Sequence, residues 1–160
     1  MKPAVLAAVV FAVTLSTNAS AGVLPVLPTE LTGRHALEVR PPVIDFTGDG
    51  TGFLGGATRH ASLPKPRLKT LRDFGRLHWS SWTSTDARAT GAVWLDNGIP
   101  DEASGTFLRY SVEVRAFRPR NGMFTRLAFV YWTGDMPHAT VRSAHFYPAT
   151  QYGPGYWQWF

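Results

Sequence analysis

Apolar and polar side chains alternate most regularly between Phe107 and Phe117. A repeat of two residues predicts a half-buried β-strand with one apolar and one polar face. The apolar positions of this stretch are Leu108, Tyr110, Val112, Val114 and Ala116.

Asn121-Gly122 separates this stretch from a second one, Phe124–Thr133. Asn-Gly is the favoured pair for a two-residue hairpin turn in which both φ angles are positive. The turn and the parity of the apolar residues select the same register, and such agreement is what specifies strand pairing. The predicted partners are Ala116 with Leu127, Val114 with Phe129 and Val112 with Tyr131.

The chain beyond residue 42 contains short stretches of β-branched and aromatic residues between Gly, Asn and Pro, with no sustained helical periodicity. Many short segments with frequent turn signals are typical of a β-sandwich or barrel. We expect an all-β domain over residues 43–160, a single-domain sandwich or partly open antiparallel barrel with the Phe107–Thr133 hairpin at its centre. The other strands are expected at Val43–Phe46, Gly75–Trp82, Ala87–Leu95, Val141–Tyr147 and Tyr156–Phe160.

Residues 1–21 have the three parts of a secretory signal. Met1-Lys2 carries a positive charge, Ala4–Leu15 is an apolar run, and Ala19-Ser20-Ala21 suits a signal peptidase. The apolar run is shorter than the roughly 20 residues that a membrane helix needs. We expect cleavage after Ala21, a secreted or envelope-associated protein, and no transmembrane segment after cleavage. The proline-rich residues 22–42 are expected to form an extended, poorly ordered lead-in.

The composition fits an exported domain that is stabilised by packing. The chain has no cysteine, but it has six Trp, ten Phe and five Tyr. Its formal net charge is +5, and Arg greatly outnumbers Lys. A basic exported chain is drawn to anionic partners, although a GC-rich genome also explains an excess of arginine.

The glycine-rich stretch Asp45–Gly56 suggests either a ligand loop or a turn. A P-loop needs a lysine after its glycines, and Phe53 and Leu54 stand near that position. An EF-hand needs oxygen ligands at alternate positions and a final bidentate glutamate, whereas Asp45 and Asp49 are four apart and no Glu follows. A tight turn between strands is therefore expected, and no cofactor. Calcium is the alternative; its candidate ligands are Asp45, Asp49, Asp96, Asp101 and Glu102.

A second polar cluster, Asp96–Glu102, reads DNGIPDE. Asp, Asn, Gly and Pro are turn formers, so a turn is expected there as well. The chain has no Gly-x-Ser-x-Gly elbow, no cysteine nucleophile and no His-Glu-x-x-His motif. The remaining enzymatic alternative is a secreted hydrolase whose paired carboxylates meet only in the fold. Its candidates are Asp96, Asp101, Glu102 and Glu113.

Two tryptophans are candidates for stacking on sugars. By parity, Trp94 shares a strand face with Arg88 and Thr90, and Trp132 shares one with Arg126. If any indole meets solvent or a ligand, we expect it to be Trp94 or Trp132, although large aromatics more often belong to the core.

The aromatic residues Tyr156–Phe160 follow Gly153-Pro154-Gly155 and alternate as a strand does. We expect a packed strand, because so many exposed aromatics would promote aggregation. A free anchor in the membrane interface is the alternative.

The segment Lys65–Phe74 is basic, and its basic residues lie beside Pro64 and Pro66. A solvated loop is the usual explanation, and a contact with an anionic polymer is the functional one. Its candidate residues are Lys65, Arg67, Lys69 and Arg72. Nucleic acid is not expected as a partner, because the chain has no known nucleic-acid-binding motif.

An ordered series of motifs runs along the chain, namely TGDGTG (Thr47–Gly52), LHWSSW (Leu77–Trp82), ASGTF (Ala103–Phe107), RPRNGMFTRL (Arg118–Leu127) and the YWQWF stretch. This series resembles a family of small secreted actinobacterial proteins. The resemblance implies secretion and a β-rich domain, and it supplies no catalytic residues. Many members carry a Cys-x-x-x-Cys pair where this chain has Gly98 and Glu102. The resemblance therefore implies a looser turn here, or one that holds an ion.

These observations favour an exported, non-enzymatic protein that associates with the cell envelope through an anionic wall polymer or polysaccharide. A secreted hydrolase and a sugar-binding β-sandwich module are the alternatives. The oligomeric state has no signal in the sequence.

Overall fold

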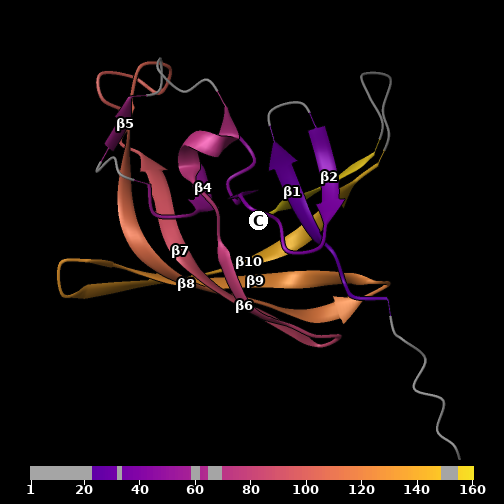
Figure 1. The fold of residues 1–160 in the computed structure, drawn as a ribbon. Coiled ribbons are helices and arrows are strands. Elements are labelled where there is room, and N and C mark those ends of the chain that lie inside the picture. The colour runs from indigo at the N-terminus through magenta and orange to yellow at the C-terminus, as the bar shows by residue number, and fades with distance from the viewer. Residues whose placement is uncertain (1–22, 32–33, 59–61, 65–69, 149–154) are drawn as a thin grey trace, which may run out of the picture.

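The computed structural model describes residues 23–31, 34–58, 62–64, 70–148 and 155–160. In that part of the chain the regular elements are β-strands and one short 3₁₀ helix (Figure 1). They are β1 (Leu27–Leu31), β2 (Arg34–Glu38), β3 (Ile44–Asp45), β4 (Gly52–Gly55), β5 (Ser62–Pro64), η2 (Leu71–Phe74), β6 (His78–Trp82), β7 (Asp86–Asp96), β8 (Thr106–Arg120), β9 (Met123–Thr133), β10 (Met136–Tyr147) and β11 (Tyr156–Trp159).

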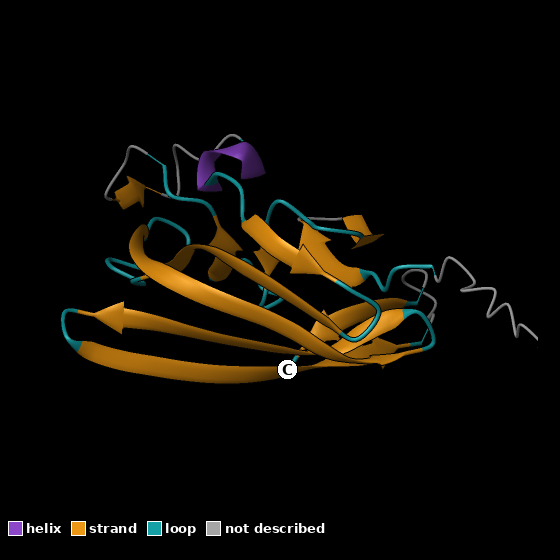
Figure 2. Ribbon diagram, turned by 60° about the horizontal axis from the view of Figure 1, so that its bottom comes forward, coloured by secondary structure: helices purple, strands orange, loops and turns teal. Residues whose placement is uncertain are grey.

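Nine strands form one antiparallel sheet in the order β11-β10-β9-β8-β7-β4-β3, with β5 paired to β8 and β6 paired to β7. The long strands curl, so that the sheet forms a half-barrel (Figure 2). β1 and β2 form a separate two-stranded hairpin. The expectation of an all-β, partly open antiparallel barrel is confirmed.

The β8–β9 hairpin has the predicted register. Val114 pairs with Phe129, and the flanking pairs predicted from parity also form. Asn121 and Gly122 have φ angles of 50° and 75° and connect the paired residues Arg120 and Met123. The turn therefore has positive φ at both central residues, as the Asn-Gly pair predicts.

The Gly-rich stretch is a turn, as expected, but it is shorter than the sequence suggests. β3 and β4 pair antiparallel on either side of it, with Asp45 opposite Phe53. Gly48 and Gly50 supply φ angles of 75° and 79°, which other residues rarely adopt.

The prediction that residues 22–42 form a poorly ordered lead-in is wrong for the described residues, because β1 and β2 lie there. Leu27 is fully buried and belongs to the main core. Three tryptophan indoles hold the proline-rich segment by donating to proline carbonyls. Trp82 donates to Pro25 (2.9 Å), Trp159 to Pro28 (3.0 Å) and Trp79 to Pro41 (2.8 Å).

The main core lies on one face of the sheet. Its members alternate along the strands, as in the series Ala87, Ala89 and Val93 of β7. Phe46 reaches it from the β3–β4 turn and contacts Phe129, with ring centroids 4.6 Å apart. Alternating burial of this kind is what a sheet with one packed face requires.

A second, smaller core lies on the opposite face, at the end of the sheet near η2. It contains Ala92 and Trp94 of β7, whose neighbour Val93 belongs to the main core. Phe74 of η2 covers this face, and its ring stacks on Phe53 at 4.2 Å. Glycines allow this close layering. A Cβ on Gly91 would lie 2.1 Å from the carbonyl oxygen of Gly55.

The aromatic segment 156–160 forms strand β11, as predicted. β11 pairs with β10, with Ala144 opposite Trp159. Trp159 is 1% exposed and packs in the main core. Within the described residues, no helix is long and apolar enough to span a membrane.

Candidate functional site

Trp94 is a core residue, so its prediction as a ligand contact is wrong. It is fully buried, and its indole nitrogen donates to the carbonyl of Gly56 at 3.3 Å. Phe74 packs edge-on against it at 5.6 Å. The parity argument failed because the face of β7 that is exposed at Arg88 and Thr90 is covered by η2 farther along the strand.

The carboxylates of the Gly-rich turn bind the turn itself. Asp45 Oδ1 accepts from the backbone and hydroxyl of Thr47 (3.1 and 3.0 Å) and from the backbone of Gly48 (2.8 Å). Asp49 Oδ1 accepts from the backbone and hydroxyl of Thr51. These contacts support the turn interpretation, because local Asx bonds are what stabilise such connections.

The Asp96–Glu102 loop is organised in the same way. Asp96 accepts from Gly98, Asn97 accepts from Ile99 and Thr106, and Asp101 accepts from Ser104. Local hydrogen bonds to side-chain oxygens therefore organise this loop, as the turn interpretation predicts. The hydrolase candidate Glu113 lies on the outer face of β8, opposite Thr90 of β7. Across the described residues, no three acidic or histidine side chains group as a metal site would need.

Asp45 offers a test through pH, because it is only 3% exposed. Burial raises the pKa of the Asp45 carboxyl, while hydrogen bonds from Gly48 and Thr47 oppose the rise. The native state therefore keeps this proton to a higher pH than the unfolded state, and its contribution to stability falls as pH rises from about 4 through the native pKa.

We expect Asp45→Asn to be at least as stable as the wild type at pH 7, because the amide oxygen keeps the acceptor and the buried charge is gone. The difference in Tm from the wild type should shrink as the pH is lowered to 4. Asp45→Ala should lose about 1–3 kcal/mol at either pH, because the donors lose their partner. Thermal unfolding between pH 4 and 8 measures this. An Asn variant as unstable as the Ala variant would contradict it.

The basic run predicted to contact a polymer is mostly outside the described residues. Lys65, Arg67 and Lys69 lie there, and their role stays a prediction. Arg72 is described; it is exposed on η2. A polymer-binding role for this segment gains no geometric support from Arg72 alone.

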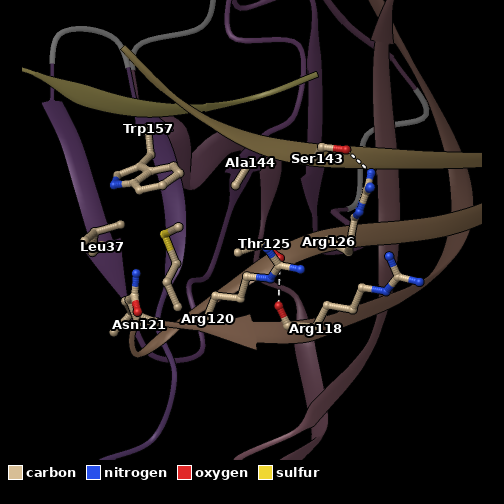
Figure 3. A pocket seen from close by; sticks show the side chains of 11 residues that line it. Leu37, Arg118, Arg120, Asn121, Thr125, Arg126, Ser143, Ala144 and Trp157 are labelled. Atoms are coloured by element: carbon tan, nitrogen blue, oxygen red, sulfur yellow. Dashed lines mark hydrogen bonds between the residues drawn. The ribbon is translucent and has the colours of Figure 1, made fainter. Parts of the chain in front are cut away.

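A pocket at the end of the β8–β9 hairpin, and not the basic segment, brings several arginines together in the described residues. Its volume is about 430 Å³, and Arg118, Arg120 and Arg126 line it (Figure 3). β8 supplies the first two and β9 the third, while the Asn121-Gly122 turn holds the two strand ends together. The other lining residues are Val26, Leu37, Asn121, Met123, Thr125, Ser143, Ala144 and Trp157.

No carboxylate is among the described residues that line this pocket. Two other arginines, Arg88 and Arg115, bind a carboxylate outside the pocket, since both pair with Asp86. Arg126 donates to the hydroxyl of Ser143, its partner in the β9–β10 register. Three guanidinium groups without a carboxylate produce a positive potential that suits an anion.

Trp132, the other predicted tryptophan, lies at the surface. It is 37% exposed and borders a shallow groove of about 470 Å³ on the outer face of the sheet. Hydrogen-bonding side chains share this groove. They are Arg76, His78, Thr90, Ser111 and Glu113.

The sequence contained a signal for the arginine pocket that parity analysis missed. Arg118 and Arg120 lie on either side of Pro119 immediately before the Asn-Gly turn. A hairpin turn brings the ends of its two strands together. Arg126, on the strand after the turn, is therefore expected to lie near Arg118 and Arg120. Leu37 and Trp157 on the apolar side of the pocket come from β2 and β11, which no local pattern connects to this turn.

No family model, curated protein or solved structure matches this chain. The resemblance to secreted actinobacterial proteins therefore stays a prediction, and the function has to be argued from the sites above.

Proposed function

We propose that this protein is exported, is not an enzyme, and associates with the cell envelope by binding anionic polymers at the pocket of Arg118, Arg120 and Arg126. The observation that carries the proposal is the convergence of three guanidinium groups in a pocket with no carboxylate among its described lining residues. Guanidinium groups bind phosphate and carboxylate oxygens in a planar, often bidentate geometry.

The sequence supports the same class of partner. The formal net charge is +5, and residues 1–21 have the pattern of a secretory signal. Phosphate- or carboxylate-bearing polymers of the envelope are the anions that an exported chain meets in abundance. The carboxylates proposed for a hydrolase serve as acceptors within their own loop at Asp96 and Asp101, which favours the non-enzymatic proposal.

Co-sedimentation of the protein with purified bacterial cell walls tests the proposal. We expect binding at low salt and release as ionic strength rises, because the Debye length falls from about 10 Å at 0.1 M to about 3 Å at 1 M. The variant in which Arg118, Arg120 and Arg126 are changed to Gln should bind at least about tenfold more weakly, since charge-assisted hydrogen bonds are the stronger ones. Its Tm should stay near that of the wild type.

The matched control changes Lys65, Arg67 and Lys69 to Gln, which removes the same charge at the segment predicted from the sequence. If only the pocket variant loses binding, the pocket is the site. If the control loses as much, net charge alone drives association. If only the control loses binding, the pocket is the wrong site.

A sugar-binding module is the second candidate, and the groove beside Trp132 favours it. An exposed indole next to donors and acceptors suits a sugar ring, which has an apolar face and hydroxyl edges. Walls stripped of phosphate polymers separate the two candidates. Binding that survives stripping and is lost in Trp132→Ala would favour the sugar-binding function.

A further inference from the structure

The arginine pocket has two chemically different sides. In Figure 3 the guanidinium groups of Arg118 and Arg126 lie on one side, and Leu37 and Trp157 lie on the other. Val26, Met123 and Ala144 complete the apolar part of the lining. A simple inorganic anion would use only the charged side.

The apolar side is accessible to a ligand. Leu37 of β2 is 51% exposed, which leaves half of a leucine in water at the rim. Trp157 of β11 is half-buried and is supported from the adjacent strand by Phe146, with ring centroids 5.2 Å apart. Met123 is buried behind them, and its flexible thioether adapts to irregular apolar shapes.

Three segments that are distant in sequence supply this side. Leu37 comes from the β1–β2 hairpin, Met123 from the start of β9, and Trp157 from β11. The backbone of Val26 bonds to Gly122 and Phe124, both at 3.0 Å, which fixes the hairpin beside the turn that carries the arginines. The apolar and charged sides are therefore parts of one built pocket.

We propose that the ligand of this pocket is the lipid end of an anionic envelope polymer, whose phosphate binds the three arginines and whose alkyl chain begins against Leu37, Met123 and Trp157. The inference rests on the proposed function, since it takes the same pocket and the same anionic class, and it adds an apolar chain to the anion. The volume of the pocket, about 430 Å³, lies in the range of small-molecule sites. The pocket therefore accommodates the head group and the start of the alkyl chain.

The test is isothermal titration calorimetry of the full chain with three soluble probes: decyl phosphate below its micelle concentration, inorganic phosphate, and decyl maltoside. We expect decyl phosphate to bind at least about tenfold more tightly than either of the others, because it alone engages both sides. Its binding should have a negative heat-capacity change, the marker of apolar burial, whereas phosphate binding should have almost none.

One variant tests the apolar side of the pocket, another tests the charged side, and a third is a control. Leu37→Ser should weaken decyl phosphate binding about fivefold and leave inorganic phosphate unchanged, because it removes apolar contact alone. Leu108→Ser, at an exposed leucine outside the pocket, is the matched control and should change neither. The triple Arg→Gln variant should weaken both phosphate probes.

The outcomes separate this inference from the proposed function. Equal affinity for decyl phosphate and inorganic phosphate would overturn the lipid inference and leave anion binding standing. Equal affinity for decyl phosphate and decyl maltoside would show that the apolar chain adheres without the arginines, and this would also overturn it. Failure of the wild-type protein to sediment with the walls at low salt would refute the proposed function, whatever decyl phosphate does.

Discussion

Trp159→Ala is expected to lose about 3–5 kcal/mol of unfolding free energy, as large-to-small changes of buried aromatics do. Trp159 is 1% exposed and packs in the main core. Its indole also donates to the carbonyl of Pro28 at 3.0 Å. The substitution therefore opens a cavity and leaves a buried carbonyl without its donor, and the two losses act on the same contact between β11 and β1.

Urea denaturation of Trp159→Ala and of Phe160→Ala measures this effect. Phe160 is 52% exposed, so its loss should cost far less. Deletion of residues 156–160 should destabilise the domain at least as much as Trp159→Ala. A deletion variant that unfolds like the wild type and no longer partitions to membranes would instead favour the membrane-anchor alternative.

Gly91→Ala is expected to cost about 3 kcal/mol, at the upper end of the usual range for overpacking. A Cβ at this position would lie 2.1 Å from the carbonyl oxygen of Gly55 and 3.0 Å from Leu77 Cδ2. The carbonyl cannot turn aside, because Gly55 belongs to β4 and pairs with Ala92 of β7. Relief of this clash would require β4 and β7 to separate, and both strands contribute side chains to the second core.

Gly134→Ala is the control for the second prediction. Its Cβ would have no neighbour within 4 Å, but the residue has a φ of 62°. The loss of unfolding free energy in Gly134→Ala should therefore come only from holding alanine at a positive φ, about 1–2 kcal/mol. Thermal and urea unfolding of both variants compares them. If Gly91→Ala proves no more costly than Gly134→Ala, the close pairing of β4 with β7 is not rigid.

The parts of the fold that could be predicted are those whose information is local. The register of β8 and β9 depends on Asn121-Gly122 and on alternation within the two strands it joins. The β1–β2 hairpin could not be found in this way. Its order depends on indoles supplied 57 and 131 residues away, by Trp82 to Pro25 and by Trp159 to Pro28. Proline-rich sequence alone gives no sign of these donors.

The same limit explains the outcome for the candidate sites. Parity placed Trp94 and Trp132 on outward faces, and this held for Trp132, which is 37% exposed. It failed for Trp94, which lies beneath Phe74 of η2. The arginine pocket was missed because Leu37 and Trp157 reach Arg120 only through tertiary contacts.

The contact between Trp159 and Pro28 also has a consequence for the order of folding. β7, β8, β9 and β10 form a meander of neighbouring hairpins, whereas the contact between β11 and β1 closes a loop of 131 residues. Non-local contacts of this kind form late, because the entropy of the intervening chain has to be lost first. The main core is thus incomplete until β11 has been synthesised.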